Sequence, residues 1–280
     1  MSENDPAQVR PATLTAPDGT TIALETRGDG EPIVLVHGTT SDRSTFNELV
    51  PHLAEARAVT TFDRRGRGLS EDGEGYAIDS EFADAAAVID RIASEHGGPV
   101  DVFGHSFGAW IALGATQHTD NVRRLVVYSP GFGARYPEGA LDRIEAATDR
   151  DDLDTALHVL LTDVIGMKVE DVEFMRASPV WQNRIDNAGT IARECRADES
   201  FLETHGDLLG NVGVPVRVVS GAVNAEEKRE HAAEIARRLP DAELVEMEGE
   251  GHAAHHTAPA ALAALILGHI DAGRTAAASA

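Results

Sequence analysis

Residues 97–108 read Gly-Gly-Pro-Val-Asp-Val-Phe-Gly-His-Ser-Phe-Gly. The apolar residues 100–103 predict a strand, and the apolar stretch 107–116 predicts a helix directly after it. Between them stands a G-x-S-x-G pattern, Gly104 to Gly108. In this pattern a tight strand-to-helix turn lifts the serine hydroxyl clear of the sheet, and the glycines leave room for the neighbouring backbone. Ser106 is therefore the candidate nucleophile. The alternative is a glycine-rich turn without chemistry.

The composition indicates a globular protein that does not bind polyanions. The chain has 280 residues, of which 42% are hydrophobic, and a formal net charge of −23. This charge argues against binding to nucleic acid or to an anionic membrane. No run approaches the ~20 apolar residues that span a bilayer, and the acidic amino terminus shows no signal peptide. We expect a cytoplasmic protein whose partner is a small-molecule substrate, and we make no prediction of its oligomeric state.

Predicted strands alternate with predicted helices along most of the chain. The strands cover residues 12–15, 20–25, 33–36, 58–62, 100–103, 122–128, 214–219 and 243–247, and the helices cover 46–54, 80–96, 107–116, 226–239 and 258–270. This alternation predicts an α/β fold, with a mostly parallel, doubly wound sheet flanked by helices. Residues 134–210 break the pattern with helix-like pieces, such as 153–164 and 200–209, and a low-complexity tail follows at 272–280.

Two further motifs follow predicted strands. Strand 33–36 runs into His37-Gly38-Thr39-Thr40, and strand 58–62 runs into Asp63-Arg-Arg-Gly-Arg-Gly-Leu-Ser70. Together with the G-x-S-x-G turn, these motifs resemble the α/β-hydrolase fold family. The resemblance implies an oxyanion hole formed by the backbone N–H groups of Thr39 and Phe107, and it implies a structural role for the 63–70 turn. The alternatives are that His-Gly merely ends a strand, and that the arginines of the turn grip an anionic substrate.

The same resemblance implies a domain organisation. Residues 1–133 and 211–280 would form the α/β-hydrolase core, and residues 134–210 would form a helical cap, or lid, that shapes the substrate pocket. The large apolar residues of this insertion are Met167, Phe174, Met175, Trp181 and Phe201. We expect most of them to form the cap's own core.

The chain offers a base for Ser106 but no acid at the expected places. His252 follows the last predicted strand, at the family's Gly-His position, and is the predicted general base. The family's usual acid position lies in Gly221-Ala-Val-Asn224 and holds an asparagine, and the second place that some relatives use reads Ser129-Pro130. The predicted catalytic set is therefore Ser106, His252 and Asn224.

The missing carboxylate leaves several explanations open. Glu226, Glu227 or Glu138 could reach His252, the set with Asn224 could work slowly or on activated substrates, or the site does not hydrolyse at all. An engineered aspartate-to-asparagine change would give the same sequence. The question matters because replacing the triad aspartate of a serine protease by asparagine lowers kcat ~10⁴-fold.

The remaining histidines and the one cysteine have simpler interpretations. Cys195 has no partner for a disulfide and is interpreted as a spectator thiol. His105 is expected to pack beneath the elbow. His252, His255 and His256 form an H-x-x-H-H cluster without a carboxylate or cysteine at a recognised ligand spacing, so we expect neither a metal nor a cofactor.

Two functions fit these motifs. The first is a hydrolase that attacks a small carboxylic ester, thioester or lactone through a Ser106 acyl-enzyme, with His252 as general base. The second is a non-hydrolytic member of the fold: a small-molecule binding protein, or a cofactor-free lyase or isomerase with His252 as base, since the same fold supports unrelated chemistries. The acidic surface favours neutral or cationic substrates.

Overall fold

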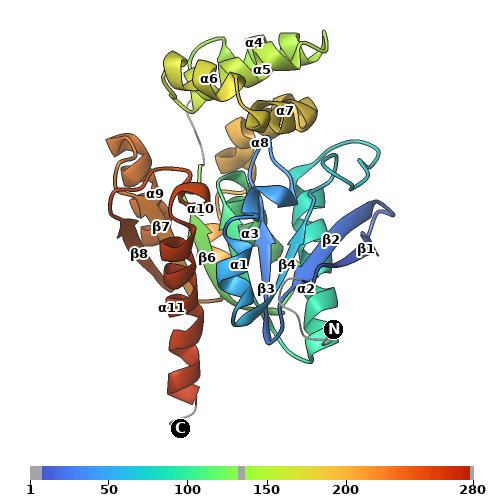
Figure 1. Cartoon of the computed structure of the whole chain (residues 1–280), viewed down its shortest axis with the longest axis vertical. Coiled ribbons are helices and arrows are strands. Elements are labelled where there is room, and N and C mark those ends of the chain that lie inside the picture. Colours follow the sequence, from blue (N-terminus) through green and yellow to red (C-terminus); the bar gives the residue numbers. More distant parts are fainter. Residues whose placement is uncertain (1–7, 132–135, 278–280) are drawn as a thin grey trace.

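The computed structural model describes residues 8–131 and 136–277. Its centre is an eight-stranded sheet with the strand order β1-β2-β4-β3-β5-β6-β7-β8 (Figure 1). The strands are β1 (Arg10–Thr15), β2 (Thr21–Arg27), β3 (Glu31–Val36), β4 (Arg57–Phe62), β5 (Val100–His105), β6 (Val122–Tyr128), β7 (Val216–Gly221) and β8 (Ala242–Met247). The β1–β2 and β2–β4 pairs are antiparallel, and the other pairs are parallel. The predicted fold class is confirmed.

Helices cover both faces of the sheet. On one face lie α2 (Ile78–His96), α3 (Phe107–Ala115) and α9 (Glu226–Arg238), and on the other lie α1 (Val50–Ala54) and α11 (Pro259–Ala277). Alternate residues of β3 divide between these two layers: Ile33 packs with α1 and α11, and Val34 packs with α2 and α3. Burial on both faces explains why the strand is a continuous apolar run.

Several element boundaries differ from the prediction, and two of these differences have a clear physical reason. In place of the predicted helix 46–54, the structure has a 3₁₀ turn, η1 (Arg43–Phe46), followed by the short helix α1. Pro51 lies in the first turn of α1, where its missing N–H removes no helical hydrogen bond. The terminal helix α11 continues to Ala277, into the segment assigned above to a tail, because alanine has the highest helix propensity. Among the described residues, no helix is both long enough and apolar enough to cross a membrane.

A helical segment lies over the carboxyl ends of the parallel strands (Figure 1). It contains α4 (Ala140–Thr148), α5 (Leu153–Val159), η2 (Leu160–Val164), α6 (Val169–Arg176), α7 (Pro179–Asp186), η3 (Ala188–Thr190) and α8 (Ile191–Thr204), and it is called the cap below. No strand occurs in its described residues, 136–204. The predicted boundary at residues 133 and 134 lies outside the described part of the chain.

The cap has an apolar core of its own, but its large side chains do not all belong to it. Trp181 is buried in this core, with Met167 and Met175 packed against it. Phe201 instead lies in the core of the sheet domain, 5.0 Å from the Trp110 ring, and Phe174 is 82% exposed. Phe201 departs from the expectation because α8 descends from the cap onto α2 and α3.

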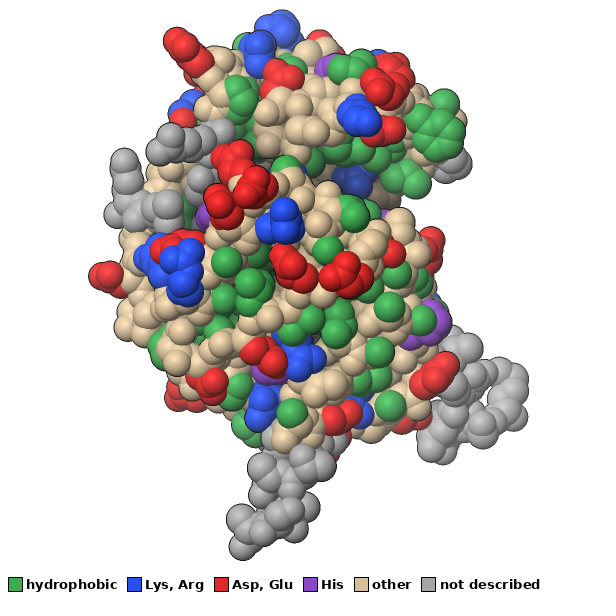
Figure 2. All heavy atoms as spheres, turned by 90° about the vertical axis from the view of Figure 1, so that its left-hand side faces the viewer, with side chains coloured by type: hydrophobic (Ala, Val, Ile, Leu, Met, Phe, Trp, Pro, Cys, Tyr) green, Lys and Arg blue, Asp and Glu red, His purple; other side chains and the backbone are tan. Residues whose placement is uncertain are grey.

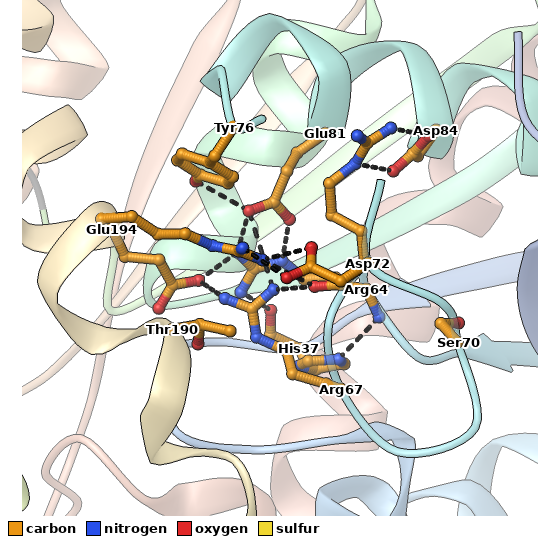
Figure 3. Close-up of polar contacts among 12 residues, drawn as sticks. His37, Arg64, Arg67, Ser70, Asp72, Tyr76, Glu81, Asp84, Thr190 and Glu194 are labelled. Atoms are coloured by element: carbon orange, nitrogen blue, oxygen red, sulfur yellow. Dashed lines mark hydrogen bonds and ion pairs between the residues drawn. The ribbon is translucent and has the colours of Figure 1, made fainter. Parts of the chain in front are cut away.

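A buried ionic cluster joins the cap to the sheet domain (Figure 3). Arg64 Nε and Nη2 donate to Glu81 of α2 at 2.7 and 2.8 Å, and both Arg64 and Arg67 bond to Glu194 of the cap helix α8. Burial alone would raise the pKa of Glu81, but the two guanidinium groups outweigh it and hold that pKa at about 2. These arginines are therefore committed to protein carboxylates, which supports the structural interpretation of the 63–70 turn.

Candidate active site

The parallel strands bring the candidate residues together at one edge of the sheet. Val36 of β3 pairs with Gly104 of β5, His105 of β5 pairs with Tyr128 of β6, and Tyr128 pairs with Val219 of β7. Carboxyl ends of parallel strands meet at the same edge, which is where open α/β sheets bind ligands. The loops after these strands therefore surround the end of β5, where Ser106 follows.

Ser106 has the backbone geometry that its motif predicts. Its φ is 54° and its ψ is −123°, a conformation that non-glycine residues rarely adopt. A Cβ on Gly108 would lie 2.3 Å from the Val36 carbonyl oxygen, so only glycine fits there. Among the described residues, no hydrogen bond ties the Ser106 hydroxyl to another side chain, which leaves it available at the turn.

The His37–Thr40 loop lies directly beside Ser106. A Cβ on Gly38 would be 3.0 Å from Ser106 Cβ and 3.5 Å from its Oγ. The loop is held by His37, whose Nδ1 donates to the Gly38 carbonyl at 3.0 Å and whose Nε2 accepts from the Arg64 N–H at 3.1 Å. Among the described residues, the N–H groups of Thr39 and Phe107 have no hydrogen-bond partner. Both N–H groups therefore remain free to donate.

His252 lies in the loop between β8 and α10 (Ala254–Thr257) and is anchored from β5 and β6. The Tyr128 hydroxyl donates to the Gly251 carbonyl and accepts from the Ala254 N–H. His105 Nε2 donates to the His252 carbonyl at 2.9 Å, with the two rings 4.8 Å apart. His105 therefore packs beneath the site and supports the loop.

The Nδ1 atom of His252 is 2.7 Å from Ser129 Oγ. Ser129 follows β6, is buried, and has a φ of 46°, while its N–H donates to the Val219 carbonyl at 2.8 Å. Ser129 stands at the second of the two places where the sequence analysis looked for an acid. This residue contacts the imidazole of His252, although its side chain is a hydroxyl and not a carboxylate. Sequence reasoning passed over Ser129 because it required a carboxylate, and no local motif marks a serine for this contact.

Asn224 does not make this contact. Its N–H donates to the Gly221 carbonyl at 3.1 Å, and its Oδ1 would lie 3.6 Å from a Cβ on Gly251. Within the described residues, no hydrogen bond joins Asn224 to His252, so Ser129 corrects the expected partner of Nδ1. Tyr128, the last residue of β6, holds the backbone on both sides of His252 through Gly251 and Ala254, and these two contacts are called the Tyr128 clamp below.

The electrostatic surroundings of His252 are cationic. Burial first, and then His105, Lys228 and Arg184, place the pKa of His252 well below its ordinary value. The glutamates offered as substitute acids, Glu138, Glu226 and Glu227, are all exposed and are absent from the groups that act on this pKa. The ring is therefore neutral at neutral pH, which is the form that a general base requires.

The other candidate groups have structural surroundings. Cys195 is a buried free thiol whose pKa is raised by burial, which suits a spectator and not a nucleophile. Burial lowers the pKa values of His255 and His256, whose rings lie 4.1 Å apart. In the described residues, no group of three or more His, Cys, Asp or Glu side chains is arranged to hold a metal ion.

Comparisons with known proteins concern the family and the fold. A model described as "Alpha/beta hydrolase family" matches residues 33–265. The pimeloyl-[acyl-carrier protein] methyl ester esterase of Neisseria meningitidis is 29% identical over 263 residues, covering 86% of this chain and 93% of that protein. The hydrolase YraK of Bacillus subtilis is 35% identical over 122 residues, a match that covers 42% of this chain and 44% of that protein.

A solved structure agrees over nearly the whole chain. An alpha/beta hydrolase from Sphaerobacter thermophilus has a TM-score of 0.81 at 30% identity, covering 91% of this chain and 98% of that one. Fold, site and relatives together define an enzyme of the hydrolase class. The chain belongs to the alpha/beta hydrolase family.

Proposed function

We propose that the protein is a serine hydrolase that cleaves a small carboxylic ester, thioester or lactone through an acyl-enzyme on Ser106. The observation that carries the proposal is the position of Ser106 on a strained turn beside the Gly38 backbone, directly after His105, whose ring lies 4.8 Å from the ring of His252. A serine needs a base on one side and donors for an oxyanion on the other. The methyl ester esterase among the relatives supports an ester as the substrate.

The proposed reaction uses residues of this chain alone. His252 Nε2 accepts the Ser106 hydroxyl proton while Oγ bonds to the substrate carbonyl carbon, and the N–H groups of Thr39 and Phe107 stabilise the resulting oxyanion. The imidazolium then protonates the leaving alcohol, thiol or ring oxygen as its bond to the carbonyl carbon breaks. In the second half, His252 takes a proton from water as the water oxygen bonds to the acyl carbon. The bond from that carbon to Ser106 Oγ then breaks, His252 returns the proton to Oγ, and the acid is released.

Ser129 has a defined place in this scheme. Its hydroxyl accepts the Nδ1–H of His252 and so presents Nε2, the unprotonated nitrogen, to Ser106. A hydroxyl supplies orientation but no negative charge to stabilise the imidazolium. We therefore expect turnover of activated esters to be much faster than turnover of simple alkyl esters.

The proposal is tested by labelling and by turnover. The protein is treated with a fluorophosphonate, and the modified peptide is located by mass spectrometry, alongside hydrolysis of p-nitrophenyl butyrate. We expect phosphonylation at Ser106 and an initial burst of p-nitrophenol of about one equivalent. Hydrolysis without a label on Ser106, or no burst and no label, would overturn it.

A second candidate function is favoured by one observation, namely that His252 is paired with a hydroxyl and not with a carboxylate. In that case His252 acts as a base on a bound small molecule and the oxyanion hole holds an enolate, without an acyl-enzyme. A protein of this kind would bind its ligand and exchange an acidic C–H proton with solvent, but it would release no p-nitrophenol.

A further inference from the structure

Arg184 lies on the cap helix α7 and faces the candidate active site. Its Nη1 donates to Thr40 Oγ1 at 2.8 Å, and Thr40 is the residue after Thr39 in the loop beside Ser106. The positive charge of Arg184 also lowers the pKa values of His105, His252, His255 and His256. The guanidinium therefore lies between the proposed oxyanion loop and the histidines.

This cation has no anionic partner in the described part of the chain. No salt bridge involves Arg184 there, its buried Nε has no hydrogen-bond partner, and burial is the only influence on its pKa, which it lowers. The chain carries 47 acidic residues against 24 lysines and arginines, so carboxylates are abundant. Yet none is placed here, although an arginine remains charged and an unpaired buried charge is costly.

The neighbouring polar residues of α7 are already committed. Asn183 and Asn187 donate to Asp42 Oδ2 at 3.0 and 3.3 Å, which fixes this helix against the loop after β3. Arg184 lies between them in the sequence and is thereby held in place, with Nη1 bonded to Thr40 and the buried Nε without a partner among the described residues. Figure 2 shows a notch between the cap and the sheet domain.

We propose that Arg184 binds a carboxylate of the substrate, so that the substrate is a small ester, thioester or lactone that also carries a carboxylate near its scissile carbonyl. This proposal rests on the proposed function. A planar guanidinium binds a carboxylate through two parallel hydrogen bonds, which fixes the orientation of the molecule as well as its charge. This differs from the neutral or cationic substrate that the acidic surface favours, because Arg184 and Lys228 place positive charge at the site itself.

The test uses two esters of matched length, mono-p-nitrophenyl adipate and p-nitrophenyl hexanoate, which differ by a terminal carboxylate. The ratio of their kcat/KM values is measured in the parent, in Arg184→Gln and in Arg184→Lys. We expect the parent to prefer the adipate ester, and we expect the ratio to fall roughly 10- to 100-fold in Arg184→Gln, the value of a hydrogen bond to a charged group. Arg184→Lys should retain part of the preference.

Arg196→Gln is the matched control. Arg196 is also on the cap, but it is exposed and paired with Glu145 and Glu199, so this change should leave the ratio as it is in the parent. If Arg184 only holds Thr40 in place, Arg184→Gln slows both esters equally and the ratio does not move. That result, or a parent that prefers the hexanoate ester, overturns the proposal.

A binding measurement separates this proposal from the proposed function. Adipate itself is titrated into the parent and into Arg184→Gln, and the midpoint of thermal unfolding is followed. We expect adipate to raise the midpoint of the parent and not that of Arg184→Gln, whether or not Ser106 forms an acyl-enzyme. Equal shifts in both proteins, or no shift in either, refute the role of Arg184 even if ester hydrolysis is found.

Discussion

Two serines, Ser106 and Ser129, occupy corresponding places on neighbouring parallel strands. His105 and Tyr128 are paired in the sheet, and each serine is the next residue along its strand. Both have a left-handed φ, 54° for Ser106 and 46° for Ser129. Ser106 is marked in the sequence by the glycines around it, whereas Ser129 is identified only by its contact with His252 in the folded chain. The same residue type at the same edge of a sheet can therefore carry different roles.

The difference lies in what each hydroxyl contacts. Ser129 Oγ is bonded to His252 Nδ1, whereas in the described residues the Ser106 hydroxyl is not bonded to any side chain. A hydroxyl that is already committed orients its partner, and a hydroxyl that is free can react. If this comparison is correct, changes at Ser129 act through the charge and orientation of His252, and changes at Ser106 remove the reaction.

The largest effect is expected from Ser129→Asp. Aspartate tolerates a left-handed φ better than most residues, and its carboxylate would stabilise the imidazolium that forms during the reaction. Since losing this charge costs a serine protease ~10⁴ in kcat, we expect kcat for p-nitrophenyl butyrate to rise roughly 10²- to 10⁴-fold. Ser129→Asn is the control with the same shape and no charge. If the two variants turn over equally, His252 does not need a charge from this position.

Ser106→Ala is expected to lower kcat by about 10²-fold. In a serine protease the whole triad is worth ~2 × 10⁶ and the aspartate alone ~3 × 10⁴, so about 10² remains for a serine and histidine that lack the acid. The rate is measured with p-nitrophenyl butyrate beside Ser80→Ala on α2, which should match the parent. A rate in Ser106→Ala equal to that of the parent would assign the chemistry to another group.

Ser129→Ala tests orientation without charge. The change removes one neutral hydrogen bond from His252, which is worth ~0.5–1.5 kcal/mol, so kcat should fall about 3- to 10-fold with KM little changed. The measurement is a full kinetic curve with the same ester. A loss as large as that of Ser106→Ala would contradict a role for Ser129 that is limited to orienting His252.

The pH dependence of kcat/KM follows from the environment of His252. Burial, followed by the influence of the His105 ring and of the cations Lys228 and Arg184, keeps the pKa of His252 well below the ordinary value, so the neutral base persists as the pH falls. We expect kcat/KM to stay level from about pH 8 down to about pH 6 and to fall only below that, since an unperturbed histidine titrates near ~6.5. In Ser129→Asp the carboxylate favours the imidazolium, and the acid limb moves to higher pH. An acid limb near pH 6.5 in the parent would contradict this reasoning.

The same contrast shows what could be predicted from the sequence. The alternation of strands and helices and the local motifs around Ser106 and His252 were sufficient for the fold and for two candidate site residues, because their signals lie within a few residues along the chain. The contact of Ser129 with His252 joins segments 123 residues apart. It depends on the Tyr128 clamp, which no pattern along the chain reveals.

The cap was the least predictable part for a similar reason. Its helical character follows from the sequence, but which faces turn toward the site is set by distant contacts. Glu194 reaches the Arg64 cluster, and Asn183 reaches Asp42, and only these contacts aim Arg184 at the loop beside Ser106. An arginine in a charged helical stretch reads as a solvated residue until its partners are known.

The smallest effect is expected from Asn224→Asp, although the family pattern places the acid at this residue. Nδ1 of His252 is bonded to Ser129, and in the described part of the chain no hydrogen bond joins Asn224, which lies beside Gly251, to the ring. A new carboxylate there would act only through space in a partly exposed loop, so we expect kcat for p-nitrophenyl butyrate to change less than about 3-fold, the size of a weak surface charge interaction. If Asn224→Asp accelerates the reaction as much as Ser129→Asp does, His252 turns to the loop after β7 when a carboxylate is offered. The site would then hold two alternative acid positions, residues 129 and 224, for one imidazole. The orientation of the His252 ring would decide which of the two positions acts on it.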